Sequence, residues 1–232
     1  MNIHGLQKMT LLDYPGKVAA TIFLGGCNFR CGYCHNFELV EGIAEPVMTE
    51  DELFVFLKKR KGILDGICVT GGEPCLRDDL PEFLLHIKNE GYKVKLDTNG
   101  HNPDMLLDLI NKEIVDYVAM DIKNSREKYA MTVGLLGNSA FDINKINKSA
   151  EILLDGKVQY EFRTTVVDEY HEESDFLSIG QWIKGASAYY LQQYTERDTV
   201  PDRTLTSPCE EKLQKIREIL LPFVPNTVIR GV

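Results

Sequence analysis

The sequence predicts an α/β fold, an incomplete (β/α)6 barrel of the TIM type that is open on one side. Short apolar runs alternate with amphipathic helical stretches along nearly the whole chain. Strands joined by helical crossovers run parallel, so this alternation indicates one parallel sheet covered by helices. A closed barrel has eight such units and typically about 250 residues. The chain has 232 residues and shows six units, which favours an open sheet.

Each strand is predicted from a short apolar run that glycine or polar residues bound. These runs lie at residues 18–24, 66–70, 92–96, 115–120, 158–167 and 188–192. Before the first run, Pro15 and Gly16 fit positions i+1 and i+2 of a type II turn. We therefore expect a single domain over residues 1–232, with an N-terminal extension at 1–16 and the partial barrel at 17–232.

The helices are predicted from apolar stripes and capping patterns. Thr49 and Glu52 form a capping box, and Asn102-Pro103 begins another helix. Further stripes begin near residues 80, 143 and 172, whereas residues 122–140 read as irregular. For the last helix we expect Ser207 as the N-cap, Pro208 at the first position and Glu210 completing a capping box.

Composition excludes several classes of protein. The net charge is −9 and no basic cluster occurs, which argues against nucleic acid or an anionic membrane as the main partner. No apolar run approaches the roughly 18 residues of a spanning helix, and the first residues do not begin a signal peptide. Six cysteines without an extracellular signal favour a reducing compartment, where thiolates hold metal. We expect a cytoplasmic protein.

Three cysteines follow the first predicted strand at a C-x3-C-x2-C spacing, namely Cys27, Cys31 and Cys34. Such a loop can wrap three thiolates round one face of a [4Fe-4S] cluster and leaves the fourth iron without a ligand from the motif. A zinc site would need a fourth ligand, which His35 is badly placed to supply. Three core thiols or half of a zinc ribbon are the alternatives. Polar residues between the cysteines argue against the first, and the lack of a second C-x2-C argues against the second.

Further polar motifs follow the ends of later predicted strands: Gly71-Gly72-Glu73-Pro74, Asp97-Thr98 and Asp121-Ile122-Lys123. Loops at the carboxyl ends of parallel strands converge, so these motifs are expected to share one site with the cysteines. Carboxylates, a threonine hydroxyl and a strand carbonyl are suitable oxygen ligands for a cation. Strand-end solvation or helix capping is the alternative. The scattered cysteines Cys68, Cys75 and Cys209 are predicted to be structural or incidental.

Together these motifs resemble the radical S-adenosylmethionine (SAM) superfamily, and within it the activating proteins of anaerobic ribonucleoside-triphosphate reductase. The resemblance rests on residues 13–17, on Cys34-His35-Asn36 at the end of the cysteine loop, and on residues 95–100 and 118–123. It spans nearly the whole chain.

The resemblance implies an oxidoreductase that binds a [4Fe-4S] cluster at the three loop cysteines. It implies SAM contacts from Gly71, Gly72, Glu73, Pro74, Asp97, Asp121 and Lys123, and a monovalent cation at Asp97, Thr98 and Asp121. The implied reaction is reductive cleavage of SAM to a 5′-deoxyadenosyl radical, which takes hydrogen from a glycine of a glycyl-radical enzyme. The implied electron donor is reduced flavodoxin or a ferredoxin-like protein.

Several alternatives stay open. Activases of pyruvate formate-lyase carry a SAM-contacting histidine where this chain has Gln193 and Tyr194, so one of these substitutes or the contact is absent. Arg163 forms either a partly buried ion pair or a contact to the substrate's backbone. The other functions considered are activation of another glycyl-radical enzyme such as pyruvate formate-lyase, small-molecule radical SAM chemistry such as that of the deazapurine-forming synthases, and an iron–sulfur electron carrier or sensor.

Overall fold

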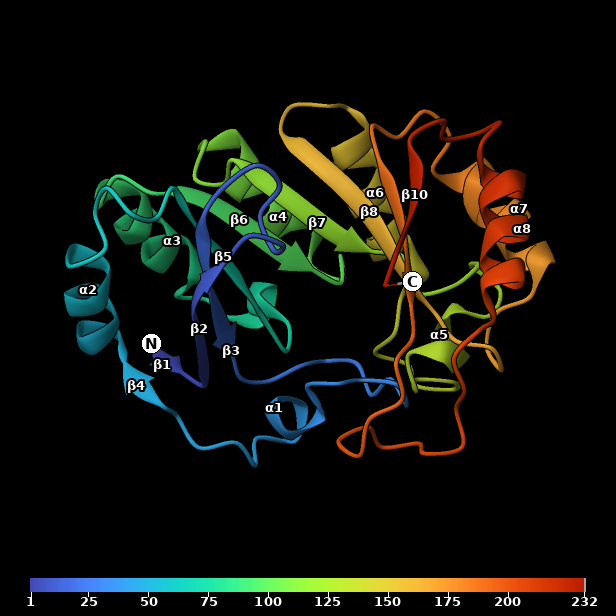
Figure 1. Cartoon of the computed structure of the whole chain (residues 1–232), viewed down its shortest axis with the longest axis horizontal. Helices are drawn as coiled ribbons and strands as arrows, with labels where there is room; N and C mark the ends of the chain where they lie inside the picture. Colours follow the sequence, from blue (N-terminus) through green and yellow to red (C-terminus); the bar gives the residue numbers. More distant parts are fainter. Residues whose placement is uncertain (232) are drawn as a thin grey trace.

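The computed structural model describes residues 1–231 and contains one curved sheet of eight strands in the order β10-β9-β8-β7-β6-β5-β3-β2 (Figure 1). Seven neighbouring strands pair in parallel: β3 Ala19–Leu24, β5 Gly66–Gly71, β6 Lys93–Thr98, β7 Tyr117–Asp121, β8 Gln159–Val166, β9 Tyr189–Gln193 and β10 Thr227–Arg230. Within residues 1–231 the end strands β2 and β10 do not pair with each other. The predicted open α/β fold is confirmed.

Two strands of this sheet were not expected. β2 Gly5–Thr10 lies in the predicted N-terminal extension and pairs antiparallel with β3, while β10 follows the last helix. Both are edge strands, and Gln7, Lys8 and Met9 of β2 are exposed. A strand buried on so little of its surface lacks the apolar run by which the six central strands were recognised. A separate two-stranded sheet joins β1 Asn2–Ile3 to β4 Met48–Thr49.

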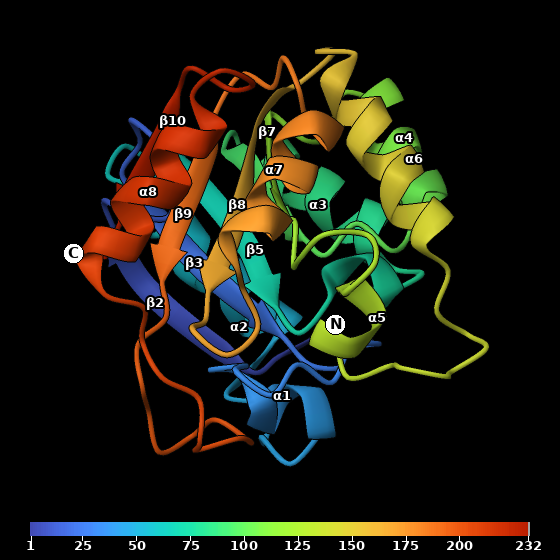
Figure 2. The same ribbon diagram turned by 90° about the vertical axis from the view of Figure 1, so that its right-hand side faces the viewer.

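Six longer helices cover the outer face of the curved sheet (Figures 1 and 2). They are α2 Glu50–Lys58, α3 Leu80–Asn89, α4 Pro103–Asn111, α6 Ile143–Leu154, α7 Glu173–Trp182 and α8 Glu210–Leu220. The predicted capping box at Thr49 and Glu52 is present at the start of α2. Shorter helical segments follow strand ends: α1 Phe37–Glu41, the 3-10 turn Pro74–Leu76 and α5 Tyr129–Thr132, which lies inside the region predicted to be irregular.

The predicted start of the last helix is wrong. Helix α8 begins at Glu210 with Cys209 as its N-cap, and no side chain caps it. The hydroxyl of Ser207 instead donates a hydrogen bond to the carbonyl oxygen of Tyr194 at 2.5 Å. A tertiary contact therefore uses the residue that the local sequence pattern assigned to the cap.

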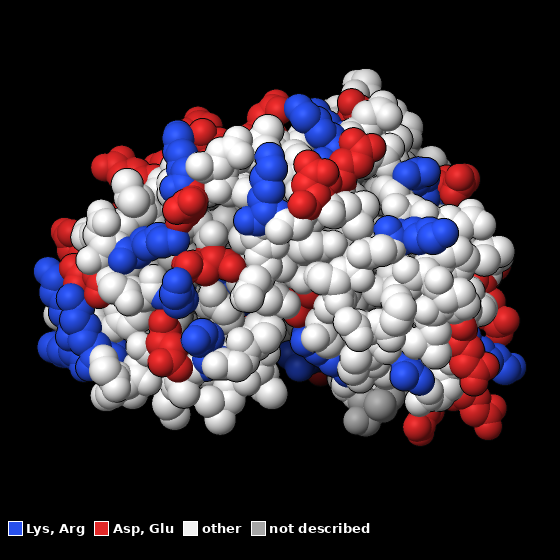
Figure 3. Space-filling model, turned by 90° about the horizontal axis from the view of Figure 1, so that it is seen from above, with Lys and Arg blue, Asp and Glu red and all other residues white. Residues whose placement is uncertain are grey.

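Figure 3 shows basic and acidic side chains interspersed over one face, without a broad basic patch. This face lies at the end of the barrel remote from the cysteine loop (Figure 1). No helix within residues 1–231 has the length and apolar character that crossing a membrane requires.

Candidate active site

A cavity of about 310 Å³ opens at the carboxyl ends of the parallel strands. It brings together ten of the eleven side chains and loop glycines that the sequence predicted for one site: Cys27, Cys31, Cys34, Gly71, Gly72, Glu73, Asp97, Thr98, Asp121 and Lys123. Pro74, the remaining one, is buried at the start of the 3-10 turn and does not line the cavity. The predicted convergence of strand-end motifs is therefore seen in the fold.

The cysteine loop runs from the end of β3 to α1 and is held by segments distant in sequence. The amide of Arg30 donates to the carbonyl of Val133 at 2.9 Å, and the amide of Asp202 donates to the carbonyl of Gly32 at 3.0 Å. Burial raises the pKa of the Cys27 thiol to about 11 and that of the Cys31 thiol to about 12. Metal ligation by these groups therefore requires the release of protons.

The three thiols are not grouped around a position for a single metal ion. Over residues 1–231, no three His, Cys, Asp or Glu side chains are grouped so that they could hold one metal ion. A mononuclear zinc site needs its ligands around one atom. A [4Fe-4S] cluster binds each thiolate through a different iron, so its ligands stand further apart.

Two glycines let the loop after β5 lie directly against the cysteine loop. A Cβ on Gly72 would stand 1.9 Å from the carbonyl oxygen of Gly26, and one on Gly71 would stand 2.3 Å from that of Leu24. Gly71 also has a φ of +121°, which L side chains rarely adopt. The amides of Gly72 and Glu73 donate to the Leu24 and Gly26 carbonyls respectively, at 2.8 Å each. The Gly-Gly pair is therefore required by this close backbone approach.

The carboxylate of Glu73 joins the motif after β5 to the motif after β6. Its Oε1 accepts from the Thr98 hydroxyl at 2.8 Å and from the Cys75 amide at 2.9 Å, and its Oε2 accepts from the Asn99 amide at 2.6 Å. Only 1% of the residue is exposed. Burial raises the pKa of Glu73, although these three hydrogen bonds oppose the increase.

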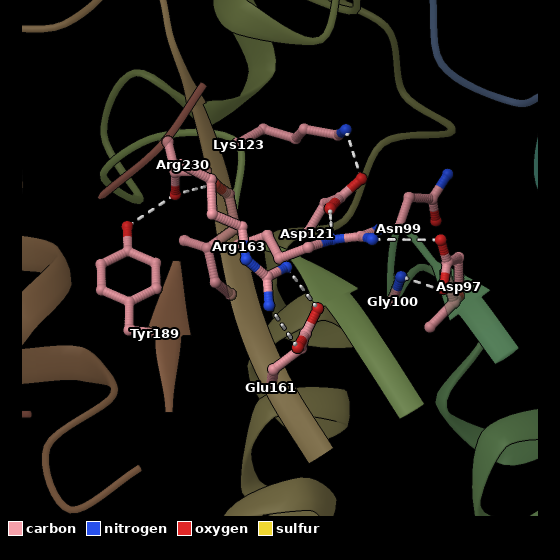
Figure 4. Close-up of polar contacts among 12 residues, drawn as sticks. Asp97, Asn99, Gly100, Asp121, Lys123, Glu161, Arg163, Tyr189 and Arg230 are labelled. Carbon is pink, nitrogen blue, oxygen red and sulfur yellow. Dashed lines mark hydrogen bonds and ion pairs between the residues drawn. The ribbon is translucent and has the colours of Figure 1, made fainter. Parts of the chain in front are cut away.

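A charged network occupies the other side of the cavity (Figure 4). Arg163 lies between two carboxylates, with Nη1 3.0 Å from Oδ2 of Asp97 and Nε 2.9 Å from Oδ1 of Asp121. Nζ of Lys123 lies 2.9 Å from Oδ2 of Asp121, and the buried Lys95 pairs with Oδ1 of Asp97. Burial alone would raise the pKa of Asp121, but the charges of Arg163 and Lys123 outweigh it and lower this pKa to about 2. Arg163 thus forms partly buried ion pairs, one of its two predicted roles.

The three side chains predicted to hold a monovalent cation, Asp97, Thr98 and Asp121, form hydrogen bonds within the protein instead. All four carboxylate oxygens of Asp97 and Asp121 accept hydrogen bonds from cationic side chains of the chain itself. The hydroxyl of Thr98 donates to Glu73 instead. These residues do not fit a bound cation in this arrangement.

Seven further polar residues line the cavity without having been predicted for the site: Tyr33, His35, Asn36, Thr70, Asn99, Thr165 and Gln192. Thr165 stands two residues after Arg163 in β8, so the alternation of a strand puts both on one face. Thr165 and Gln192 are also register partners. That alternation was the one sequence signal that could have found Thr165.

Gln193 and Tyr194, the two residues that could replace the missing histidine, differ in their position relative to the cavity. Gln193 lines the cavity, but its side-chain amide Nε2 donates to the carbonyl oxygen of Pro208 at 2.9 Å. Tyr194 is buried outside the cavity and its ring stacks on His35, with centroids 5.8 Å apart. Neither Cys68, Cys75 nor Cys209 lines the cavity, and the first two are buried.

Comparison with known proteins gives consistent matches. Residues 21–150 match the model of the radical SAM superfamily. A protein of Methanocaldococcus jannaschii named as a glycyl-radical enzyme activating enzyme is 32% identical over 99% of this chain and 96% of its own length. The pyruvate formate-lyase-activating enzyme of Clostridium pasteurianum is 30% identical over 60% of each chain.

Solved structures share the fold at low sequence identity. A radical SAM methyltransferase from Sphaerobacter thermophilus has a TM-score of 0.74 at 14% identity and covers 96% of this chain and 68% of its own. Streptococcus suis SuiB bound to S-adenosylmethionine has a TM-score of 0.68 at 12% identity, covering 91% of this chain and 52% of its own.

Proposed function

Because the chain belongs to the radical SAM superfamily, we propose that it is an activase that generates a glycyl radical on a partner enzyme, the anaerobic ribonucleoside-triphosphate reductase. The observation that carries the activase proposal is the 32% identity to a protein named as such an activating enzyme, which extends over 99% of this chain. The choice of reductase rests on the sequence motifs described above.

The family implies a [4Fe-4S] cluster and SAM, and the residues of the cavity fit both. Cys27, Cys31 and Cys34 come from one loop, line one cavity and are not grouped for a single ion. The hydroxyl of Tyr33, a residue that lines the same cavity, is buried and has no hydrogen-bond partner within residues 1–231. A buried polar group without a hydrogen-bond partner is energetically costly, so the unpaired Tyr33 hydroxyl supports the binding of a polar ligand in the cavity. We assign the cluster to the three cysteines.

When bound, the reduced cluster and SAM together supply the carbon-centred radical that takes a hydrogen atom from the glycine. The task of the chain is to bind, orient and shield. We propose that Lys123, which carries a charge facing the cavity, binds the carboxylate of SAM. Asp121 holds this cationic group in place through its ion pair with Lys123, and Asp97 acts on it indirectly through Arg163, which pairs with both carboxylates.

The amino group of SAM is assigned to the loop after β5. The carbonyls of Gly71 and Gly72 are acceptors beside the cysteine loop, and Pro74 fixes the turn that follows. A carboxylate offers about four acceptor positions, of which Glu73 uses three within the fold. One position is left for an ammonium donor. Thr98 acts by orienting Glu73.

The open barrel supports a macromolecular substrate. Strands β2 and β10 are the unpaired ends of the sheet within the described residues, so no ninth strand closes that side. We propose that a glycine-bearing loop of the partner enters there, and that the electron comes from reduced flavodoxin or a ferredoxin-like protein.

A second candidate partner is pyruvate formate-lyase. The favouring observation is the 30% identity to a pyruvate formate-lyase-activating enzyme over 60% of the chain. Against it stand Gln193 and Tyr194 at the position of the expected histidine, of which only Gln193 lines the cavity, with its amide already bound to Pro208.

The test is radical formation on the partner. The anaerobically reconstituted protein, with a strong reductant, SAM and the anaerobic reductase from the same source, should give a glycyl-radical doublet in electron paramagnetic resonance. The signal should vanish when the partner's glycine is replaced by alanine. A doublet on pyruvate formate-lyase but not on the reductase would reassign the partner. No doublet on either, with 5′-deoxyadenosine still formed, would favour a small-molecule substrate.

A further inference from the structure

We propose that the guanidinium group of Arg163 takes the place of a bound monovalent cation, so that the chain holds the carboxylate of SAM without added Na⁺ or K⁺. The identity of the ligand rests on the function proposed above. Arg163 is then a positioning residue, because it acts on the ligand through Asp121 and Lys123.

The first argument is that every carboxylate oxygen at the predicted cation site already contacts a cationic side chain of the protein. Oδ1 of Asp97 accepts from Lys95, and Oδ2 of Asp97 accepts from Arg163. Oδ1 of Asp121 accepts from Arg163, and Oδ2 accepts from Lys123. A hard cation needs several oxygen ligands of this kind. Here the negative charge of both carboxylates is already neutralised by cationic side chains that are covalently part of the protein.

The second argument is that the shape of the Arg163 guanidinium suits the positions of the Asp97 and Asp121 carboxylates in the sheet. Asp121 and Arg163 are register partners on β7 and β8, and the Arg163 side chain continues past β7 to Asp97 on β6 (Figure 4). A planar guanidinium presents several N–H donors in a fixed fork, so it can bind two carboxylates at once. A spherical ion between the same carboxylates would bridge them in the same way, but it could dissociate.

The third argument concerns charge. Lys95, Lys123 and Arg163 face Asp97 and Asp121, which leaves one positive charge in excess. That excess suits an anionic group of the ligand. An additional Na⁺ or K⁺ beside Arg163 would meet a like charge at close range in a partly buried site, where screening is weak.

The first experiment uses the unaltered, reconstituted protein. The dissociation constant of SAM, measured anaerobically by equilibrium dialysis at constant ionic strength, should agree within twofold in KCl, NaCl and tetramethylammonium chloride. The bulky organic cation cannot enter a metal site. Binding that is lost in tetramethylammonium chloride and restored by K⁺ or Na⁺ would overturn the proposal.

Variants of Arg163 sharpen the test. Arg163→Ala should open a space between two carboxylates, so its SAM dissociation constant should rise at least tenfold in tetramethylammonium chloride and recover at least threefold in KCl. Arg163→Met fills the space without a charge and should weaken binding in both salts alike. Arg217→Met is the matched control, because Arg217 donates to the Thr227 carbonyl at the amino end of β10 and does not line the cavity. It should leave SAM binding and its salt response unchanged.

A readout independent of SAM is the thermal midpoint of the same reconstituted proteins. Arg163→Ala should melt higher in KCl than in tetramethylammonium chloride, whereas the unaltered protein should not. An Arg163→Ala protein that binds SAM normally, or that responds to K⁺ no more than Arg163→Met does, would contradict the role given to Arg163. If Arg163→Ala does not fold in either salt, the salt comparison on the unaltered protein decides. Failure of the unaltered protein to bind SAM in any salt would instead contradict the proposed function, and the melting comparison would still test Arg163.

Discussion

Gly72→Ala tests whether the loop after β5 fixes the position of the cysteine loop. The new Cβ would lie 1.9 Å from the oxygen and 2.6 Å from the carbon of the Gly26 carbonyl, directly before Cys27. Both contacts are to backbone, which cannot move aside as a flexible side chain could. The two loops must therefore separate, and the hydrogen bond from the Glu73 amide to the Gly26 carbonyl, now 2.8 Å long, must lengthen.

The size of the effect follows from two contributions. Inserting a methyl group into a tightly packed position costs about 1–3 kcal/mol. Loss of one backbone hydrogen bond adds about 1 kcal/mol. The free energy of unfolding should thus fall by about 2–4 kcal/mol, and since 1 kcal/mol shifts the melting temperature by roughly 2–4 °C in a chain of this size, the midpoint should fall by roughly 5–15 °C. Displacement of Cys27 should also lower iron incorporation.

The assay combines thermal melting with iron and sulfide analysis after anaerobic reconstitution. Gly62→Ala is the control, because Gly62 has a φ of +78° but no atom of the fold lies within 4 Å of the place that a Cβ would take there. It should lose about 1–2 kcal/mol from the left-handed backbone conformation and keep its full complement of iron. A Gly72→Ala protein with normal iron content and an unchanged midpoint would refute the close approach of the two loops.

Three further predictions concern other parts of the site. Cys31→Ala should lose most of its iron and sulfide after reconstitution while Cys209→Ser keeps both, and equal contents would show that the ligands are misassigned. Lys123→Met should raise the dissociation constant of SAM by about 10- to 100-fold in equilibrium dialysis, because a charge-assisted hydrogen bond contributes about 1.5–3 kcal/mol; an unchanged constant would contradict the assignment. Burial lowers the pKa of His171, whose Nε2 lies 2.9 Å from the Lys123 carbonyl oxygen. The unfolded chain binds a proton at His171 more readily than the folded chain does, so the melting temperature should fall as the pH falls below about 6.5. His171→Gln should reduce this pH dependence of the melting temperature. Equal pH dependence in both proteins would show that His171 does not cause it.

The six central strands could be predicted because the apolar pattern that identifies each of them lies within one short segment. A parallel strand covered on both faces needs a continuous apolar run, and such runs are readable one segment at a time. Edge strand β2 has no such run, since three of its residues are exposed. The prediction that Ser207 caps the last helix was wrong for the opposite reason. Its sequence context fits an N-cap, but the fold places the Tyr194 carbonyl within reach of its hydroxyl.

The position of the site could also be predicted, but not its internal contacts. That strand-end motifs converge follows from parallel topology alone. Asp121 and Lys123 alternate within one segment, so their pairing at 2.9 Å was readable from spacing. The pairing of Asp121 with Arg163 depends on the register of β7 against β8, which are joined by a long crossover. Nothing in either segment alone specifies that register.

Strand β6 connects the two halves of the site through the alternation of its side chains. Successive residues of a strand point to opposite faces, so Asp97 and Thr98 diverge. Thr98 binds Glu73, while the neighbouring Asn99 donates to the Asn28 side chain at 2.9 Å, which places this half against the cysteine loop. Asp97 instead joins Arg163 in the charged half. A displacement of β6 would therefore disturb the cysteine loop and the charged network together, because each is tied to a different residue of this one strand end.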